Sequence, residues 1–390
     1  MTPRLKLLIA LVLTCASLTA ATSSAIAARG MEVAVQDDSV FVFQFKHYAN
    51  RAKGLKLAQQ IRATWIRSNV VWSYVVGGKN KKKRKEPKNI RYNWSGYDAL
   101  IRDAAKKGIH VQLVLTGPAP AYATGNHKVG ADRPKAGPFK RFAAAAAAHF
   151  RLLGVQRYSI WNEPNHRSWI SPIKKSPSIY RGLYQAGYGA IKAADPSALV
   201  FIAETSPFSL SKGRNATAPL QWLRGVTCAT KKYKRAHNCA TLRTDGYAHH
   251  PYDFAHKPTY KYPGADNVTL RTLGRLTSAL SKLRNAHLLE TPSGGVPQLY
   301  LTEYGFFSSG KYRLSRSKQG SYLVQGFKMA QKNPHVKQLL QYLLASPSGN
   351  LKAFDTSITT RKGGATKAFN LLKSWAQKAA KAGQIAVAKR

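Results

Sequence analysis

Acidic residues are scarce in this chain. Its 390 residues include only 16 Asp and Glu against 62 Lys and Arg, which gives a formal net charge of +46 at pH 7. Such an excess attracts polyanions, whether nucleic acid, anionic wall polymers or lipid headgroups. The densest basic run, residues 79–85 (KNKKKRK), is typical of a solvated loop, and a dedicated polyanion contact is the alternative. Nucleic acid is not an expected partner, because the sequence has no recognisable DNA-reading helix or RNA-binding aromatic motif.

Long apolar runs are also lacking after the first thirty residues, so no later segment is expected to cross a membrane. The start of the chain is different. Arg4 and Lys6 precede the apolar run 7–13, and residues 25–27 (AIA) offer a cleavage site of small residues. This layout predicts a secretory signal peptide over residues 1–27 and a secreted, extracellular protein. An uncleaved membrane anchor is the alternative.

Cysteine is rare as well. Cys15 falls within the predicted signal peptide, which leaves Cys228 and Cys239. A pair that closes a short loop in an exported protein predicts a disulfide, and two free thiols are the alternative. A metal site is not expected, because this segment adds one further ligand, His237, and contains no Cys-x-x-Cys pair. No other cofactor is expected, and the sequence does not determine the oligomeric state.

After the signal peptide, strand-like apolar runs alternate with helical patterns. Eight strand–helix units over residues 31–385 predict one α/β domain, a (β/α)8 or TIM barrel. A doubly wound sheet is the rival, but it usually has fewer strands, and no glycine-rich phosphate loop is present. The strand-like runs are 31–36, 40–45, 64–75, 109–116, 157–162, 198–205, 244–252, 297–306 and 336–346.

Two of the few glutamates stand where this fold places chemistry. Active sites of (β/α)8 barrels lie at the carboxyl ends of the strands. Glu163 follows the fourth predicted barrel strand and Glu303 ends the seventh, so the two can converge on one bound molecule. Glu204 ends the fifth and is either a supporting acid or merely structural. A single carboxylate of this kind is often only an ion-pair partner, but two convergent ones suit glycoside hydrolysis.

The residues around these two glutamates resemble a known group of enzymes. WNEPN (161–165) and LTEYGF (301–306) are similar to the acid/base and nucleophile motifs of glycoside hydrolase clan A, nearest to families 39 and 5. The resemblance implies a retaining β-glycosidase that hydrolyses O-glycosidic bonds of a poly- or oligosaccharide by double displacement. It assigns the acid/base role to Glu163, which must be protonated at rest, and the nucleophile role to Glu303, which must be ionised.

The same resemblance extends to four substrate-binding or supporting positions. Asn162 matches the asparagine that hydrogen-bonds the sugar 2-hydroxyl. Arg67 matches the arginine that holds the nucleophile ionised, although an ordinary ion pair is the alternative. His250 matches the clan's histidine, and Tyr252 matches its nucleophile-contacting tyrosine. With His249 alongside, a metal site is conceivable, but no third ligand lies nearby in the sequence.

Aromatic residues supply the remaining candidates. Tyr122, in TGPAPAYA after the third strand, resembles a sugar platform of a subsite loop, and Trp72 is a further sugar-stacking candidate, with core packing as the alternative. Clan members commonly have a tryptophan floor at the end of the eighth strand, where this chain has Tyr342. That departure leaves the sugar undetermined.

The net charge leaves one question open about the ligand and one about the function. An anionic polysaccharide or cell-wall polymer is a candidate ligand if the basic run 79–85 lies on the active-site face. The alternative function is a non-catalytic, cell-surface carbohydrate- or polyanion-binding protein built on the same barrel.

Overall fold

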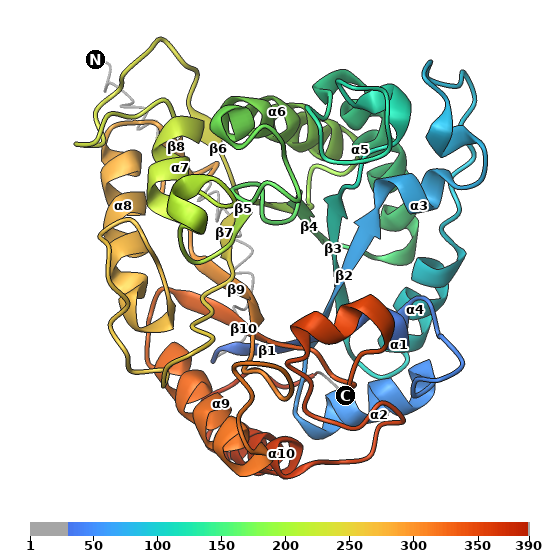
Figure 1. Ribbon diagram of the computed structural model, residues 1–390, viewed down its shortest axis with the longest axis vertical. Coiled ribbons are helices and arrows are strands. Elements are labelled where there is room, and N and C mark those ends of the chain that lie inside the picture. Colours follow the sequence, from blue (N-terminus) through green and yellow to red (C-terminus); the bar gives the residue numbers. More distant parts are fainter. Residues whose placement is uncertain (1–29, 389–390) are drawn as a thin grey trace, which may run out of the picture.

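The computed structural model describes residues 30–388, and the predicted signal peptide 1–27 with Cys15 lies outside them. Eight parallel strands close into a barrel in the order β1-β10-β9-β7-β5-β4-β3-β2, which confirms the (β/α)8 prediction (Figure 1). The barrel strands are β1 (Glu32–Gln36), β2 (Trp65–Val71), β3 (His110–Thr116), β4 (Arg157–Ile160), β5 (Leu199–Thr205), β7 (Gly246–His249), β9 (Leu299–Tyr304) and β10 (Val336–Tyr342).

Helices surround the strands on the outside (Figure 1). Strand residues are buried on nearly every position because one face fills the barrel and the other packs on this outer layer. The helices are α1 (Asp38–Phe41), α2 (Arg51–Gln60), α3 (Trp72–Val76), α4 (Ser95–Ala105), α5 (Ala136–Phe150), α6 (Ser176–Ala194), α7 (Pro219–Val226), α8 (Leu273–Asn285), α9 (Arg316–Gln331) and α10 (Lys367–Lys381). Within residues 30–388, none of them is long and apolar enough to span a membrane.

The strand expected over residues 40–45 is absent. Asp37 caps α1 instead, because its carboxylate accepts a hydrogen bond from the backbone N–H of Val40 at 3.3 Å. Val40 and Phe41 then point into the core together, which the alternation of a strand does not allow. The strand expected over 64–75 is shorter than predicted, since β2 ends at Val71 and α3 follows at once.

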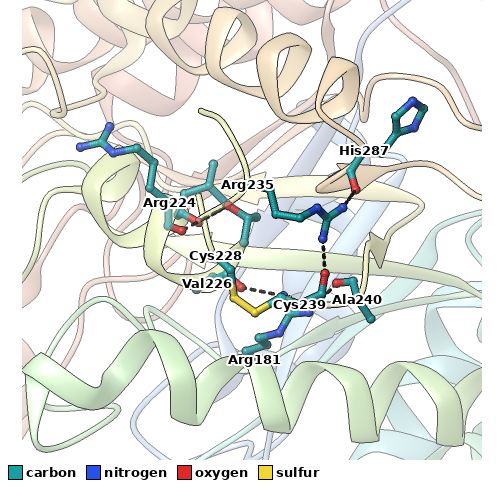
Figure 2. The surroundings of a disulfide bond; sticks show 10 residues. Arg181, Arg224, Val226, Cys228, Arg235, Cys239, Ala240 and His287 are labelled. Atoms are coloured by element: carbon teal, nitrogen blue, oxygen red, sulfur yellow. Dashed lines mark hydrogen bonds between the residues drawn. A yellow bond between two sulfur atoms is a disulfide. The ribbon is translucent and has the colours of Figure 1, made fainter. Parts of the chain in front are cut away.

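A disulfide closes the loop after α7, as predicted from the sequence. Cys228 and Cys239 are joined at an S–S distance of 2.02 Å (Figure 2). Arg235 lies beside the bridge and donates hydrogen bonds to the backbone carbonyls of Cys239 and His287. The loop leads into a small parallel pair, β6 (Leu242–Arg243) with β8 (Leu289–Glu290), outside the barrel.

Interacting charged and aromatic side chains fill the amino-terminal end of the barrel. Arg157 forms a two-pronged ion pair with Glu32, at 2.8 and 3.1 Å. Its guanidinium also lies 3.6 Å from the ring centre of Trp65 and 4.9 Å from that of Tyr300. Cation–π contacts and charge-assisted hydrogen bonds therefore hold the strands together at the end opposite the predicted site.

Candidate active site

A cleft of about 490 Å³ opens at the carboxyl ends of the barrel strands. Residues at or just beyond the carboxyl ends of β1, β4, β9 and β10 line it, and Glu163 and Glu303 are among them. A larger cavity of about 810 Å³ lies at the amino-terminal end, around Trp65, Arg157 and Tyr300. Only the first cleft contains the two carboxylates, and its position is where barrel enzymes carry their chemistry.

The chain turns sharply where it presents these acids. Trp161 and Glu163, just after β4, have φ angles of 66° and 37°, and Ala203 and Glu204 on β5 have 91° and 51°. The left-handed region costs a non-glycine residue about 1–3 kcal/mol, and such residues cluster at functional sites. Asn165 fixes the turn by donating to the carbonyls of Ser206 and Thr217 and accepting from the Ser206 N–H.

The two predicted carboxylates meet at one histidine. His250 Nδ1 lies 3.0 Å from Glu163 Oε1 and 3.7 Å from Glu303 Oε2. Adding these two distances shows that the oxygens are at most about 6.7 Å apart, an upper bound that allows the spacing of about 5–5.5 Å of retaining glycosidases and lies at the lower limit of the roughly 6.5–9.5 Å of inverting ones. Strands on different sides of the barrel therefore bring both acids to the same small volume.

Arg67 connects several side chains of the site through hydrogen bonds from inside the barrel. Its fully buried guanidinium donates to Glu303 Oε1 at 2.8 Å, to Asn162 Oδ1 at 2.6 Å and to Glu204 Oε2 at 3.1 Å. Burial opposes its charge, but Glu204 and Glu303 outweigh burial and raise the pKa of Arg67 above its usual value. The contact with Glu303 is the one that the sequence predicted.

Tyr252 and His250 both lie beside the carboxylates, and the Tyr252 contact is the one that the resemblance implied. Tyr252 donates its hydroxyl to Glu303 Oε2 at 3.2 Å. The pKa of His250 is lowered by burial, but Glu303, Glu163 and Glu204 outweigh this and raise it to about 9. His250 is therefore an imidazolium at neutral pH and donates from both nitrogens, to Glu163 at 3.0 Å and to Glu204 at 2.8 Å.

Glu204, left open by the sequence, is part of the same cluster. It is completely buried and accepts hydrogen bonds from Arg67, His250 and Thr302. Burial raises its pKa, but Arg67 and His250 outweigh burial and lower the pKa of Glu204 to about 2. In the sequence, only its position at a strand end pointed to a role in the site. Its hydrogen-bond partners lie on or next to three other strands, so no local motif contains them.

The two reactive carboxyl groups have pKa values shifted in opposite directions. Burial raises the pKa of Glu303, and the negative charges of Glu163 and Glu204 add to that effect. Burial opposes the charge of Glu163 too, but the hydrogen bond from His250 outweighs it and lowers the pKa of Glu163. These directions are the reverse of the resting protonation that the sequence resemblance implied. The reason is His250, which places its proton next to Glu163.

Two aromatic predictions are wrong. Trp72 is fully buried and stacks on Phe142 with ring centres 5.2 Å apart, so it belongs to the core and not to the cleft. Tyr122 is 4% exposed and packs edge-on against Trp72 at 6.1 Å, which leaves it no surface for a sugar. Because β2 ends at Val71, the turn into α3 directs Trp72 inward.

Tyr342 does line the cleft, at the end of β10, together with Trp169 from the loop after β4. Asp37 and Asp38, which follow β1 and line the same cleft, were not predicted from the sequence. Their position directly after a strand is the signal that pointed to Glu163, but it was hidden by the strand wrongly expected over residues 40–45. No group of three or more metal-ligating side chains suited to an ion occurs in residues 30–388.

Comparisons with known proteins agree on the architecture. No family model matches the sequence, and no curated protein matches it. Among solved structures, a family 39 glycoside hydrolase from the gut symbiont Bacteroides cellulosilyticus WH2 superposes with a TM-score of 0.63 and 15% identity. A monomeric β-xylosidase from Caulobacter crescentus CB15 gives 0.56 and 16%, and an exo-β-1,4-mannosidase from Opitutaceae bacterium strain TAV5 gives 0.58 and 12%.

The aligned regions cover 89%, 89% and 92% of this chain, respectively. They cover 64%, 68% and 61% of the solved proteins, so the chain spans about two thirds of their length. Identities of this size establish the fold. The chain has the (β/α)8 barrel fold of family 39 glycoside hydrolases and of other barrel glycosidases.

Proposed function

We propose that this protein is a secreted retaining β-glycosidase that hydrolyses O-glycosidic bonds with Glu163 as acid/base and Glu303 as nucleophile. The observation that carries the proposal is the approach of these two carboxylates within about 6.7 Å at the carboxyl end of the barrel, a limit that admits the spacing of retaining enzymes and leaves little of the inverting range of roughly 6.5–9.5 Å. The similar solved proteins include a β-xylosidase and a β-mannosidase, which supports a β-linked sugar. Export is supported by the sequence of residues 1–27.

In the first step, the Glu303 carboxylate attacks the anomeric carbon while the bond to the leaving oxygen breaks and Glu163 gives that oxygen its proton. Arg67 and Tyr252 hold Glu303 in place through hydrogen bonds of 2.8 and 3.2 Å. In the second step, Glu163 takes a proton from water, the water oxygen bonds to the anomeric carbon, and the ester to Glu303 breaks.

His250 supplies the acid form of Glu163. The hydrogen bond of 3.0 Å from Nδ1 to Glu163 holds a proton that can pass to the carboxylate when a leaving oxygen is present to accept it. The transfer removes the negative charge of Glu163 and the positive charge of His250 together, so Arg67, 2.8 Å from Glu303, is then the cation that favours the ionised nucleophile. Asn162, held by Arg67 at 2.6 Å, lines the cleft next to Glu163 and can bind a sugar hydroxyl.

The test uses aryl β-glycosides of xylose, glucose and mannose with the wild-type protein and with Glu163→Gln and Glu303→Gln. Each variant should lose about 10²–10⁴-fold or more in kcat while keeping its melting temperature within a few degrees, since general acid–base catalysis contributes that much. Glu86→Gln is the matched control, because Glu86 pairs with Arg141 outside the cleft.

Nucleophile and acid/base are then separated by azide. Glu303→Ala with azide should give a glycosyl azide of inverted configuration, because the small anion attacks from the vacated side. Full activity in either glutamine variant would exclude the assignment. Tight sugar binding by the wild type without product over a long incubation would instead support the non-catalytic alternative.

A further inference from the structure

Three exposed aromatic side chains border the cleft and take no part in the proposed chemistry. Phe43, Phe45 and Tyr74 are 38%, 47% and 56% exposed, and all three line the cleft that contains Glu163 and Glu303. We call them the aromatic ledge. In the part of the chain that the structure describes, only two other aromatic residues are exposed to a comparable degree, Tyr260 and Tyr312, and neither lines this cleft.

The ledge is built from two segments that meet at the cleft rim. Phe43 and Phe45 follow α1, and their rings stack with centres 5.6 Å apart and an interplanar angle of 22°. Tyr74, on α3, meets Phe43 edge-on at 6.3 Å. Water-exposed aromatic surface that is continuous with a cleft marks a ligand site, because its exposure has no benefit for folding.

A buried tyrosine supports the ledge from below. Tyr48 is 5% exposed, and its ring lies 6.1 Å from that of Phe45. Its hydroxyl accepts a hydrogen bond from the Ser348 N–H at 2.7 Å, which ties the segment after α1 to the segment after β10. The ledge is therefore fixed in the folded protein, and a ligand pays little entropy to order it.

The charges in the cleft indicate what kind of sugar chain fits. Four carboxylates line it, from Asp37, Asp38, Glu163 and Glu303, and among the described lining residues there is no Lys or Arg. This contrasts with a chain whose formal net charge is +46. Burial raises the pKa of Asp37 to about 7 and also raises that of Asp38, so the preference for an uncharged ligand depends on the missing cations and not on repulsion. An anionic sugar chain would find no lysine or arginine among the described lining residues to pair with, whereas an uncharged chain needs none and can stack its C–H faces on the rings.

From this geometry we propose that the aromatic ledge binds a second, uncharged sugar ring next to the one held at Glu163 and Glu303. The ligand is accordingly an uncharged oligo- or polysaccharide and not an isolated monosaccharide unit. The inference rests on the proposed function for the identity of the cleft, and it adds the substrate class and the residues that select it.

The test compares substrates with and without a second ring. Monosaccharide β-glycosyl fluorides of xylose, glucose and mannose have a leaving group too small to reach the ledge, whereas the corresponding uncharged hexasaccharides occupy it. Phe45→Ala and Tyr74→Ala should each lower kcat/KM on the cleaved hexasaccharide by about fivefold or more. On the matching fluoride they should change it less than twofold. Tyr312→Ala, which removes an equally exposed ring outside the cleft, should change neither.

Binding measurements test this inference separately from the proposed function. Calorimetric titration of the wild type and the ledge variants with the three hexasaccharides and with hexagalacturonate measures the ledge directly. Ledge-dependent hexasaccharide binding with no hydrolysis of any substrate would overturn the glycosidase proposal and support the ledge. Hydrolysis of fluoride and hexasaccharide with equal effects of the ledge variants on both would overturn the ledge alone. Ledge-dependent binding of hexagalacturonate would overturn the assignment of an uncharged ligand.

Discussion

Replacing Glu204 with glutamine removes one negative charge from the buried cluster beneath the two reactive carboxylates while preserving the shape of the side chain. Glu204 Oε2 accepts hydrogen bonds from Arg67 at 3.1 Å and from His250 at 2.8 Å. A glutamine oxygen can still accept both bonds. The cations Arg67 and His250, however, lose the charge that offsets their burial, which makes the change costly.

The size of the effect follows from the pKa of Glu204, which falls from the usual 4.5 to about 2 in the folded protein. One pKa unit corresponds to about 1.4 kcal/mol, so the ionised carboxylate stabilises the folded state by about 3 kcal/mol at pH 7. Because the folded pKa is depressed, this stability is present above pH 4.5 and is lost as the pH falls toward 2. For a chain of this length, the melting temperature should drop by about 4 °C.

Thermal and urea unfolding of wild type and Glu204→Gln between pH 7 and pH 3 measure this directly. The difference in unfolding free energy should be largest at pH 7 and should narrow steadily below pH 4.5. Activity should fall by about tenfold on substrates with poor leaving groups, because loss of the Glu204 charge lowers the pKa of His250 and depletes the imidazolium that supplies the proton to Glu163. On glycosyl fluorides, which need little protonation, the fall should be smaller.

Glu32→Gln is the matched control, since it removes a carboxylate from the Glu32–Arg157 pair at the other end of the barrel. It should leave the dependence of rate on the leaving group unchanged. A Glu204→Gln variant whose stability curve runs parallel to that of the wild type from pH 7 to pH 3 would refute the reasoning, as would an unchanged leaving-group dependence.

Two further predictions concern stability alone. Replacing Cys228 and Cys239 together with serine reopens a loop with a sequence separation of 11 residues. The free energy of unfolding should fall by about 3 kcal/mol, which urea unfolding would show as a lower midpoint. An unchanged midpoint would show that the loop is already ordered without the bridge. On α6, Gly187→Ala places a Cβ 2.8 Å from buried atoms of Ile160 and Phe139 and should destabilise the protein by about 1–3 kcal/mol. The Cβ of Gly189→Ala, on the same helix, meets nothing within 4 Å, and this change should stabilise the protein by about 0.5–1 kcal/mol. Equal effects of the two substitutions on the free energy of unfolding would contradict this packing.

The barrel could be predicted from the sequence because apolar β-branched runs and helical patterns alternate along its whole length. Glu163, Glu303 and Arg67 could be placed because each stands on or just after a barrel strand, and the barrel brings those strand ends together. The disulfide followed from the short spacing of Cys228 and Cys239. In each of these cases a local pattern and the symmetry of the fold are enough.

The errors arose where local pattern and packing disagree. Residues 40–45 form an apolar run typical of a strand, but the cap provided by Asp37 starts a helix that takes up the first two of them. Aromatic side chains carry no sign of their direction, so Trp72 and Tyr122 looked like sugar platforms and are core residues. Two rings at the cleft rim that were not predicted, those of Phe43 and Phe45, lie in the segment whose structure was wrongly predicted.

The basic exterior and the aromatic cleft differ in how they respond to ionic strength. At 1 M salt, electrostatic forces are screened beyond about 3 Å, so any attraction of an anionic polymer to exposed lysines would weaken. Stacking against aromatic rings is insensitive to such screening, because burial of apolar surface does not depend on long-range fields. A salt titration would therefore distinguish a ligand that stacks in the cleft from one attracted to the exterior.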